Sequence, residues 1–256
     1  MKINVSSNFA DVAKKVSELG RQGQFAAAVA LTKTANEVRT ELKAEISRSF
    51  DRPTRYTLNS LYVKPANKST LESFVWLKDA TYKGTPADRY LKPQIFGGDR
   101  ALKSMEKALQ SAGMMQRGQF AVPATGAQLD AFGNVKRSQI VQIMSQLKVQ
   151  RGGGYDSKKS NSAASKRTVR RQGVTYFAVA KQLGNLKPGI YFKRMFAHGS
   201  AIRPVFIFTA SVNYKPRFKF FEVADQIHSK RLPVIFDEEL EKAIATAFLR
   251  NQGSLI

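Results

Sequence analysis

The sequence contains no cysteine, one tryptophan and two histidines in 256 residues. Without cysteine the chain cannot form disulfide bonds, cysteine zinc sites or a thiol nucleophile. No apolar run approaches the roughly 18 residues that a membrane-spanning helix requires. The opening MKINVSSNFADVAKKV also lacks an apolar block followed by a small-residue cleavage site. We therefore expect a soluble protein, made in the cytoplasm, with no membrane partner.

Acidic residues are scarce as well. The chain has 19 Asp and Glu against 42 Lys and Arg, a formal net charge of +23. A chain of this charge repels itself and attracts polyanions. Nucleic acid is the usual polyanion, and acidic neighbours in an assembly are the alternative. The apolar content of 43% is enough for a hydrophobic core and excludes wholesale disorder.

The N-terminal part has helical periodicity. The segment Phe25–Phe50 is rich in good helix formers and contains neither glycine nor proline. Pro53 disfavours helix just beyond it, and a shorter helix is predicted from about Phe9 to Leu19. The longer helix has one apolar stripe, because its apolar residues recur at spacings of three and four. The stripe consists of Leu31, Ala35, Val38, Leu42 and Ile46.

Short apolar and aromatic runs follow this helix. Leu58–Val63 and Leu71–Leu77 are typical of two strands or a hairpin. Prolines and glycines interrupt Gly84–Arg100, which we predict to be a loop with at most one helical turn. Asp99 is then predicted to cap a helix that ends near Ser111.

The C-terminal half combines strands and helices. A helix is predicted from about Val135 to Leu147, and the helical pattern from Pro216 to Leu249 is predicted to break at Pro233. The order predicts an α+β fold, in which an antiparallel sheet is faced by a long N-terminal helix and two C-terminal helices. The strands expected in this half are Val174–Ala180, Ile190–Met195 and Arg203–Val212.

A basic segment interrupts this pattern at residues 151–171. RGGGYDSKKSNSAASKRTVRR has seven Lys and Arg, one acidic residue and few large apolar residues. Such a composition cannot bury enough surface to offset the entropy of ordering. We predict a single domain over 1–256, with an irregular α-rich insertion at about 80–149 and this flexible loop. The loop is predicted to contact DNA phosphates or an acidic partner. The alternative is a solvated spacer that makes no such contact. The predicted contact residues are Arg151, Lys158, Lys159, Lys166, Arg167, Arg170 and Arg171.

Catalytic motifs are missing from the sequence. His198 and His228 stand thirty residues apart without the further ligands that a metal site needs. Gly152–Gly154 has no following Lys-Ser/Thr in a strand-to-helix context, so it is not typical of a phosphate-binding loop. We expect no catalytic, cofactor-binding or metal-binding residues, no cofactor and no enzymatic activity.

Acidic residues gather near the C-terminus. Three of them are expected in the first turn of the last helix, where the helix dipole favours negative charge. The alternative interpretation is an acidic inter-subunit surface that complements the basic loop of an adjacent copy. Its residues are Asp237, Glu238, Glu239 and Glu241.

Two segments carry a resemblance to a known family. AAAVALTKTANEVRTELKAEISRSFDRP, followed by TLNSLYVKPA, resembles the N-terminal region of the minor tail protein Z family of lambda-type tailed phages. RPVFIFTASVNYKPRFKFFEVADQIHSKRLPVIFDEELEKAI resembles the C-terminal pattern of that family, with its Arg-Leu-Pro step at Arg231–Pro233 and its Glu-Leu spacing at Glu239–Leu240. The resemblance covers roughly residues 25–65 and 170–250.

The resemblance implies a non-enzymatic structural protein of the virion. It would belong to the neck or tail-completion region and form a homo-oligomeric ring that joins tail to head around the DNA path. Its expected partners are copies of itself, head-connector, tail-terminator or tail-tube proteins, and packaged double-stranded DNA. The helices at Phe25–Phe50 and Pro216–Leu249 are the expected contact elements between copies. The alternative is a nucleic-acid-binding protein that coats or condenses DNA without reading its sequence.

Overall fold

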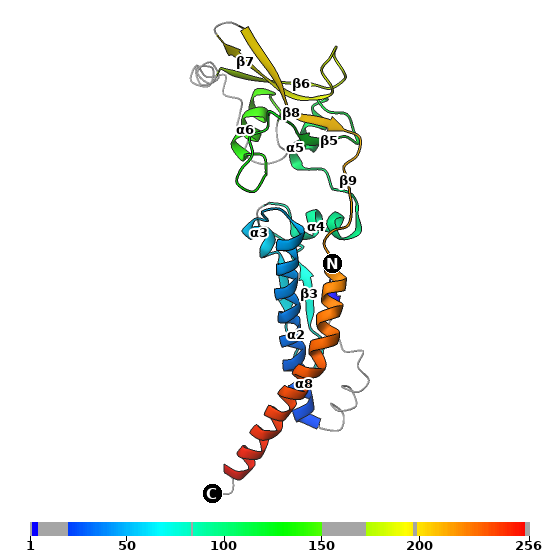
Figure 1. Cartoon of the computed structure of the whole chain (residues 1–256), viewed down its shortest axis with the longest axis vertical. Coiled ribbons are helices and arrows are strands. Elements are labelled where there is room, and N and C mark those ends of the chain that lie inside the picture. The colour runs from blue at the N-terminus through cyan, green and yellow to red at the C-terminus, as the bar shows by residue number, and fades with distance from the viewer. Residues whose placement is uncertain (1, 5–19, 83, 150–172, 197–198, 254–256) are drawn as a thin grey trace. The chain divides into compact units, whose positions relative to one another are not determined.

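The computed structural model describes residues 2–82, except 5–19, and residues 84–149, 173–196 and 199–253. The predicted helix Phe9–Leu19 and the basic loop at 151–171 lie outside the described residues. The chain forms two compact units, which Figure 1 shows in one view. The first unit comprises Met1–Gly97 and Lys215–Ile256, and the second comprises Gly98–Tyr214. The α+β class is confirmed, whereas the assignment to a single domain stays a prediction.

Two long antiparallel helices form the frame of the first unit. They are α2 (Gly20–Ser49) and α8 (Phe220–Gly253), which lie side by side in Figure 1. Lys33 Nζ lies 2.8 Å from Glu239 Oε1, and Arg231 Nε lies 2.7 Å from Glu37 Oε2. The apolar stripe predicted for α2 is buried in this unit, with at most 3% exposure at each of its residues. The stripe is therefore unavailable to neighbouring copies, and any contact between copies must use other faces of these helices.

A small antiparallel sheet packs against α2. Its strand order is β1-β3-β2, with β1 at Lys2–Asn4, β2 at Leu61–Lys64 and β3 at Phe74–Leu77. The predicted hairpin is thus confirmed, and a short helix, α3 (Arg55–Leu58), precedes it. Buried residues of β2 and β3 join the core between this sheet and the long helices.

Two helices of the first unit contradict the predictions made from proline. Gly84–Arg100 is not a loop, because it contains the helix α4 (Ala87–Phe96) with Pro93 inside and buried. The C-terminal region is one continuous helix, α8, and not two helices separated at Pro233. An internal proline removes one backbone N–H from a helix. Burial of Leu232 and Phe236 on either side of Pro233 offsets that loss.

The second unit is built on a four-stranded antiparallel sheet. The order is β5-β8-β7-β6, with β5 at Phe120–Pro123, β6 at Val174–Val179, β7 at Gly189–Phe196 and β8 at Gly199–Thr209. The three predicted strands are confirmed. The fourth strand, β5, lies in the region predicted to be irregular and α-rich. A fully buried β8 residue, Val205, sits at a register irregularity opposite β7.

Helices α5 (Ser104–Ser111) and α6 (Arg137–Gln146) share one core with this sheet. The long helices α2 and α8 face the smaller antiparallel sheet of the first unit, in agreement with the predicted α+β arrangement, although one C-terminal helix stands in place of two. The prediction that Asp99 caps α5 is wrong. Lys103 occupies that position, and Asp99 belongs to β4.

The two chain segments that connect the units are paired. In the second unit, β4 (Gly98–Asp99) pairs with β9 (Asn213–Tyr214). In the first unit, the Gln94 carbonyl oxygen accepts hydrogen bonds from the backbone N–H groups of Arg217 and Phe218, at 2.8 and 2.9 Å. The chain therefore leaves and re-enters each unit at neighbouring points.

Candidate interaction surfaces

The positive charge is unevenly divided between the units. The second unit has 19 Lys and Arg against four Asp and Glu, a formal net charge of +15. The first unit has 23 against 15, a formal net charge of +8. The second unit is shorter, so its charge density is much the higher of the two.

Each described acidic residue of the second unit is engaged within that unit. Asp99 Oδ1 accepts a hydrogen bond from Val212 N at 2.9 Å, and Asp130 Oδ1 accepts two from its own turn. Glu106 is fully buried and forms an ion pair with Arg100. These carboxylates hold the fold together and do not neutralise the surface.

The surface of the second unit therefore carries cations without counter-charges. Each of the lysine and arginine side chains named below is exposed, and none of them forms an ion pair within the described part of the chain. An array of this kind attracts phosphates or carboxylates without selecting a sequence. These residues are Lys107, Arg117, Lys136, Arg137, Lys148, Lys181, Lys187, Lys193, Arg194 and Arg203.

One part of this surface is also apolar. We call Lys193–Phe196 of β7 and Gly199–Arg203 of β8 the hairpin end. Met195 is 62% exposed, Phe196 54% and Ile202 46%. Three large apolar side chains exposed on one short hairpin are typical of an interaction site rather than of ordinary surface.

The strand register assigns these side chains to two faces of the hairpin. Arg203 is paired with Phe192, so Arg203, Arg194 and Phe196 share one face because alternate residues of a strand point the same way. The Arg194 guanidinium lies 5.4 Å from the centroid of the Phe196 ring, within the range of a cation–π contact. The other face carries Lys193, Met195 and Ile202.

The outer edge of β8 is open at the hairpin end. β5 pairs with β8 only from Phe206 to Thr209, and N–H groups of the following loop reach the carbonyl oxygens of Pro204 and Val205. No strand within the described ranges pairs with that edge between Gly199 and Arg203. An open edge offers backbone hydrogen bonds to a partner in addition to the side chains.

The four acidic residues singled out in the sequence lie well inside α8 and not in the first turn of a separate helix. Glu239 faces α2, where it is 9% exposed and accepts hydrogen bonds from Lys33 and Lys242 at 2.8 and 2.7 Å. These hydrogen bonds, that from Lys242 first, lower the pKa of Glu239. Glu239 thus forms its ion pairs within its own chain, with Lys33 and Lys242. Asp237, Glu238 and Glu241 are exposed.

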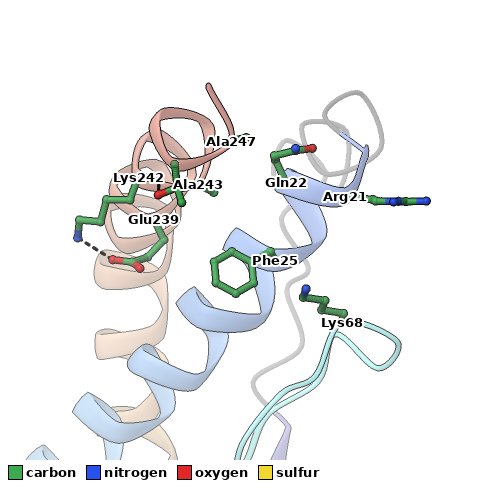
Figure 2. A pocket seen from close by; sticks show the side chains of 9 residues that line it. Arg21, Gln22, Phe25, Lys68, Glu239, Lys242, Ala243 and Ala247 are labelled. Atoms are coloured by element: carbon green, nitrogen blue, oxygen red, sulfur yellow. Dashed lines mark hydrogen bonds and ion pairs between the residues drawn. The ribbon is translucent and has the colours of Figure 1, made fainter. Parts of the chain in front are cut away.

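A hollow of about 610 Å³ lies in the first unit between the start of α2, the loop joining β2 to β3, and the later turns of α8. Figure 2 shows the Phe25 ring in the space between the two helices, whereas Arg21 points away from α8. Lys68 Nζ lies 5.1 Å from the centroid of that ring. The hollow is lined by Arg21, Gln22, Phe25, Lys68, Glu239, Lys242, Ala243, Thr246 and Ala247.

Other residues considered from the sequence fall into two groups. His228 lies half-buried on α8, and burial lowers its pKa while the nearby Asp225 opposes that shift. His198 and all seven basic residues predicted for the loop lie outside the described residues. Over the described ranges there is no group of three His, Asp or Glu that could hold a metal ion, and no helix is long and apolar enough to cross a membrane.

Comparison of the chain with protein-family models, with curated proteins and with solved structures finds no match.

Sequence reasoning overlooked the hairpin end. The predicted strands Ile190–Met195 and Arg203–Val212 leave out Phe196 and Gly199–Ile202, which extend β7 and β8. A strand pattern also does not distinguish exposed from buried apolar residues. The available signal was the placement of Lys193, Arg194 and Arg203 among the apolar residues.

Proposed function

We propose that the protein is a non-enzymatic structural component of a tailed-phage virion. In this proposal it belongs to the neck or tail-completion region and assembles as a ring that joins tail to head around the DNA path. The sequence resemblance at residues 25–65 and 170–250 supports this assignment. Its localisation would be the virion, after synthesis in the host cytoplasm.

The observation that carries the proposal is the concentration of net positive charge in the second unit. The second unit has a net charge of +15 and exposed cations that no described carboxylate neutralises. The first unit supplies a scaffold of two long helices and a small sheet. A ring of such subunits would place many copies of a basic surface around one path, where they attract DNA phosphates or the acidic surfaces of neighbouring virion proteins.

Electron microscopy of the purified protein tests the proposal directly. We expect closed rings with a central opening, either of the protein alone or of the protein mixed with a linear duplex, and immunogold label at the neck of tailed particles from the producing culture. Label on the capsid surface, or no label on particles, would contradict the proposal.

A second candidate function is sequence-independent binding along nucleic acid. The exposed Lys193, Arg194 and Arg203 favour it, because cations on a two-stranded ribbon can follow a groove of the duplex. This protein would bind DNA as a monomer, with a steep salt dependence. The two candidates differ in what microscopy shows, since coating covers the whole duplex whereas a ring encircles it at one place.

The predicted loop contacts can be tested in the same assays. Replacing Lys158, Lys159, Lys166, Arg167, Arg170 and Arg171 with Gln removes six charges and leaves about +17 of the original +23. If all six contact phosphates, the slope of log K against log salt falls by about five units, at roughly 0.9 per contact, with unchanged base preference. An unchanged slope would identify the loop as a spacer.

A further inference from the structure

We propose that the hairpin end of one copy docks on the outer face of α8 of a neighbouring copy. The outer face of α8 is defined here as Val234, Glu238, Glu241 and Ile244. The inference rests on the proposed function, since it requires copies of the chain to assemble. It adds the identity of the two surfaces that meet.

The hairpin end has the composition of a protein-binding surface. Phe196, with Arg194 over its ring, lies on the same face of the hairpin as Arg203. Aromatic residues, methionine and arginine are enriched at protein interfaces. On the face with the two arginines, a phosphate backbone would pair with the guanidinium groups but would leave the exposed ring of Phe196 in water, so the observations favour a protein partner over DNA.

The outer face of α8 is its complement in both charge and apolarity. At 3.6 residues per turn, its four residues fall within an arc of about 120°. Leu232 and Phe236 point to the opposite side, where they are buried at 1% exposure each. Val234 and Ile244 are each 46% exposed, and the two glutamates between them are exposed as well. Two acidic side chains thus lie between two apolar ones along this face.

The dimensions of the two surfaces agree. Val234 and Ile244 are about 15 Å apart along the helix axis, at 1.5 Å per residue. The Phe192–Arg203 and Phe196–Gly199 pairs of the hairpin are about 13 Å apart, at roughly 3.3 Å per residue. Arg194 and Arg203 can therefore reach Glu238 and Glu241 of another copy while Phe196 packs beside Val234 or Ile244. Arginine and carboxylate groups pair in a bidentate geometry, which fixes the orientation.

This contact joins two different patches. Each copy offers one hairpin end and one α8 outer face, so the contact is heterologous and can be repeated from copy to copy until a ring closes.

Charge reversal tests the proposal on the full-length chain. Sedimentation velocity at low salt measures self-association of Arg194→Glu/Arg203→Glu and of Glu238→Lys/Glu241→Lys. We expect each double variant to associate roughly tenfold or more weakly than the unmodified protein, because each places like charges across the contact. A chain carrying all four substitutions should regain association. Lys181→Glu/Lys187→Glu is the matched control, since it makes the same change of charge in the loop joining β6 to β7, at the opposite end of β7 from the hairpin end, and should leave association unchanged.

Mixing the two double variants shows whether the contact joins different copies. In an equimolar mixture both contacts between unlike copies are complementary, one with the native charges and one with both charges reversed. The mixture should therefore regain association, in assemblies that alternate the two variants, whereas each variant alone stays weakly associated. Circular dichroism and thermal melting confirm that each variant is folded.

Three results would overturn the proposal. The first is association of both double variants like the unmodified protein, which would leave ring formation through other surfaces intact. The second is failure of the fourfold variant to regain association. The third is loss of duplex binding in Arg194→Glu/Arg203→Glu without any change in self-association, which would assign the hairpin end to DNA. An unmodified protein that stays monomeric with and without DNA would contradict both this inference and the proposed ring.

Discussion

Arg100 and Glu106 form a buried ion pair in the second unit, with 2.8 Å between Arg100 Nη1 and Glu106 Oε2. The same carboxylate accepts hydrogen bonds from the backbone N–H groups of Lys103 and Ala121, at 2.6 and 2.8 Å. It therefore joins the start of α5 to strand β5. Burial alone would raise the pKa of Glu106, but the hydrogen bonds from Arg100, Lys103 and Ala121 together lower it.

Replacing Glu106 with Gln should destabilise the protein by about 3 kcal/mol at pH 7, because the change leaves the Arg100 guanidinium poorly paired in a buried site. Urea unfolding followed by circular dichroism measures the loss. A lower pKa in the folded state means that the carboxylate stabilises the fold above about pH 4, its unfolded value. This contribution is lost as the pH falls through the lower folded value. The loss of stability between pH 7 and pH 3 should thus be smaller in Glu106→Gln than in the unmodified protein.

Phe236→Ala should cost about 3–5 kcal/mol, because Phe236 is 1% exposed in the core between α8 and α2. Val234→Ala is the matched control on the same helix. Val234 is 46% exposed, so its truncation should stay within about 0.5 kcal/mol. Chemical denaturation of the two variants in parallel gives the comparison. Similar losses in both would show that α8 is not oriented as described.

Gln139→Ala should destabilise the second unit by about 1–3 kcal/mol. Gln139 is 2% exposed; its Oε1 accepts from Gln128 N at 2.7 Å, and its Nε2 donates to the Gly126 carbonyl oxygen at 3.1 Å. The variant leaves both backbone groups without these partners. Ser145→Ala, at an exposed position of the same helix, should have little effect. Thermal melting distinguishes the two, and equal melting temperatures would contradict the role given to Gln139.

His228 should make the protein less stable in mild acid. Burial lowers its pKa in the folded state, so the unfolded chain takes up the proton more readily. Stability should fall as the pH drops below about 6.5, the unfolded value, and should level off once the pH passes below the folded value. Melting temperatures at pH 7.5 and pH 5.5 measure this change. His228→Gln should reduce the difference between them, and an equal difference in both proteins would refute the assignment.

The strongly periodic parts of the fold could be predicted from the sequence. The stripe from Leu31 to Ile46 gave α2, and β-branched and aromatic runs gave β6, β7 and β8. Two of the errors came from prolines. Pro93 and Pro233 each lie inside a helix, because packing of the surrounding turns offsets the missing hydrogen bond. Local sequence patterns do not contain that tertiary contribution.

The interaction surfaces were less predictable than the fold. The misplacement of Asp237–Glu239 in a first helical turn followed directly from the break expected at Pro233. The ion pair between Glu239 and Lys33 joins residues 206 positions apart, which no spacing rule reveals. Exposure of Met195 and Phe196 likewise depends on β6 beginning at Val174, opposite Arg194, which is a property of the sheet and not of either residue.

The two chain segments that connect the units are hydrogen-bonded to each other at Gln94–Phe218 and at β4–β9. The coding sequence of the second unit could therefore be removed or replaced as one piece. Because the chain enters and leaves it at adjacent points, residues 98–214 form a cassette whose ends already meet. A short Gly-Ser linker from Gly97 to Lys215 is enough to close the first unit without it, since insertions are tolerated where both ends lie close together. The same geometry allows evolution to replace the charged second unit with a different inserted domain while the helical first unit is inherited unchanged.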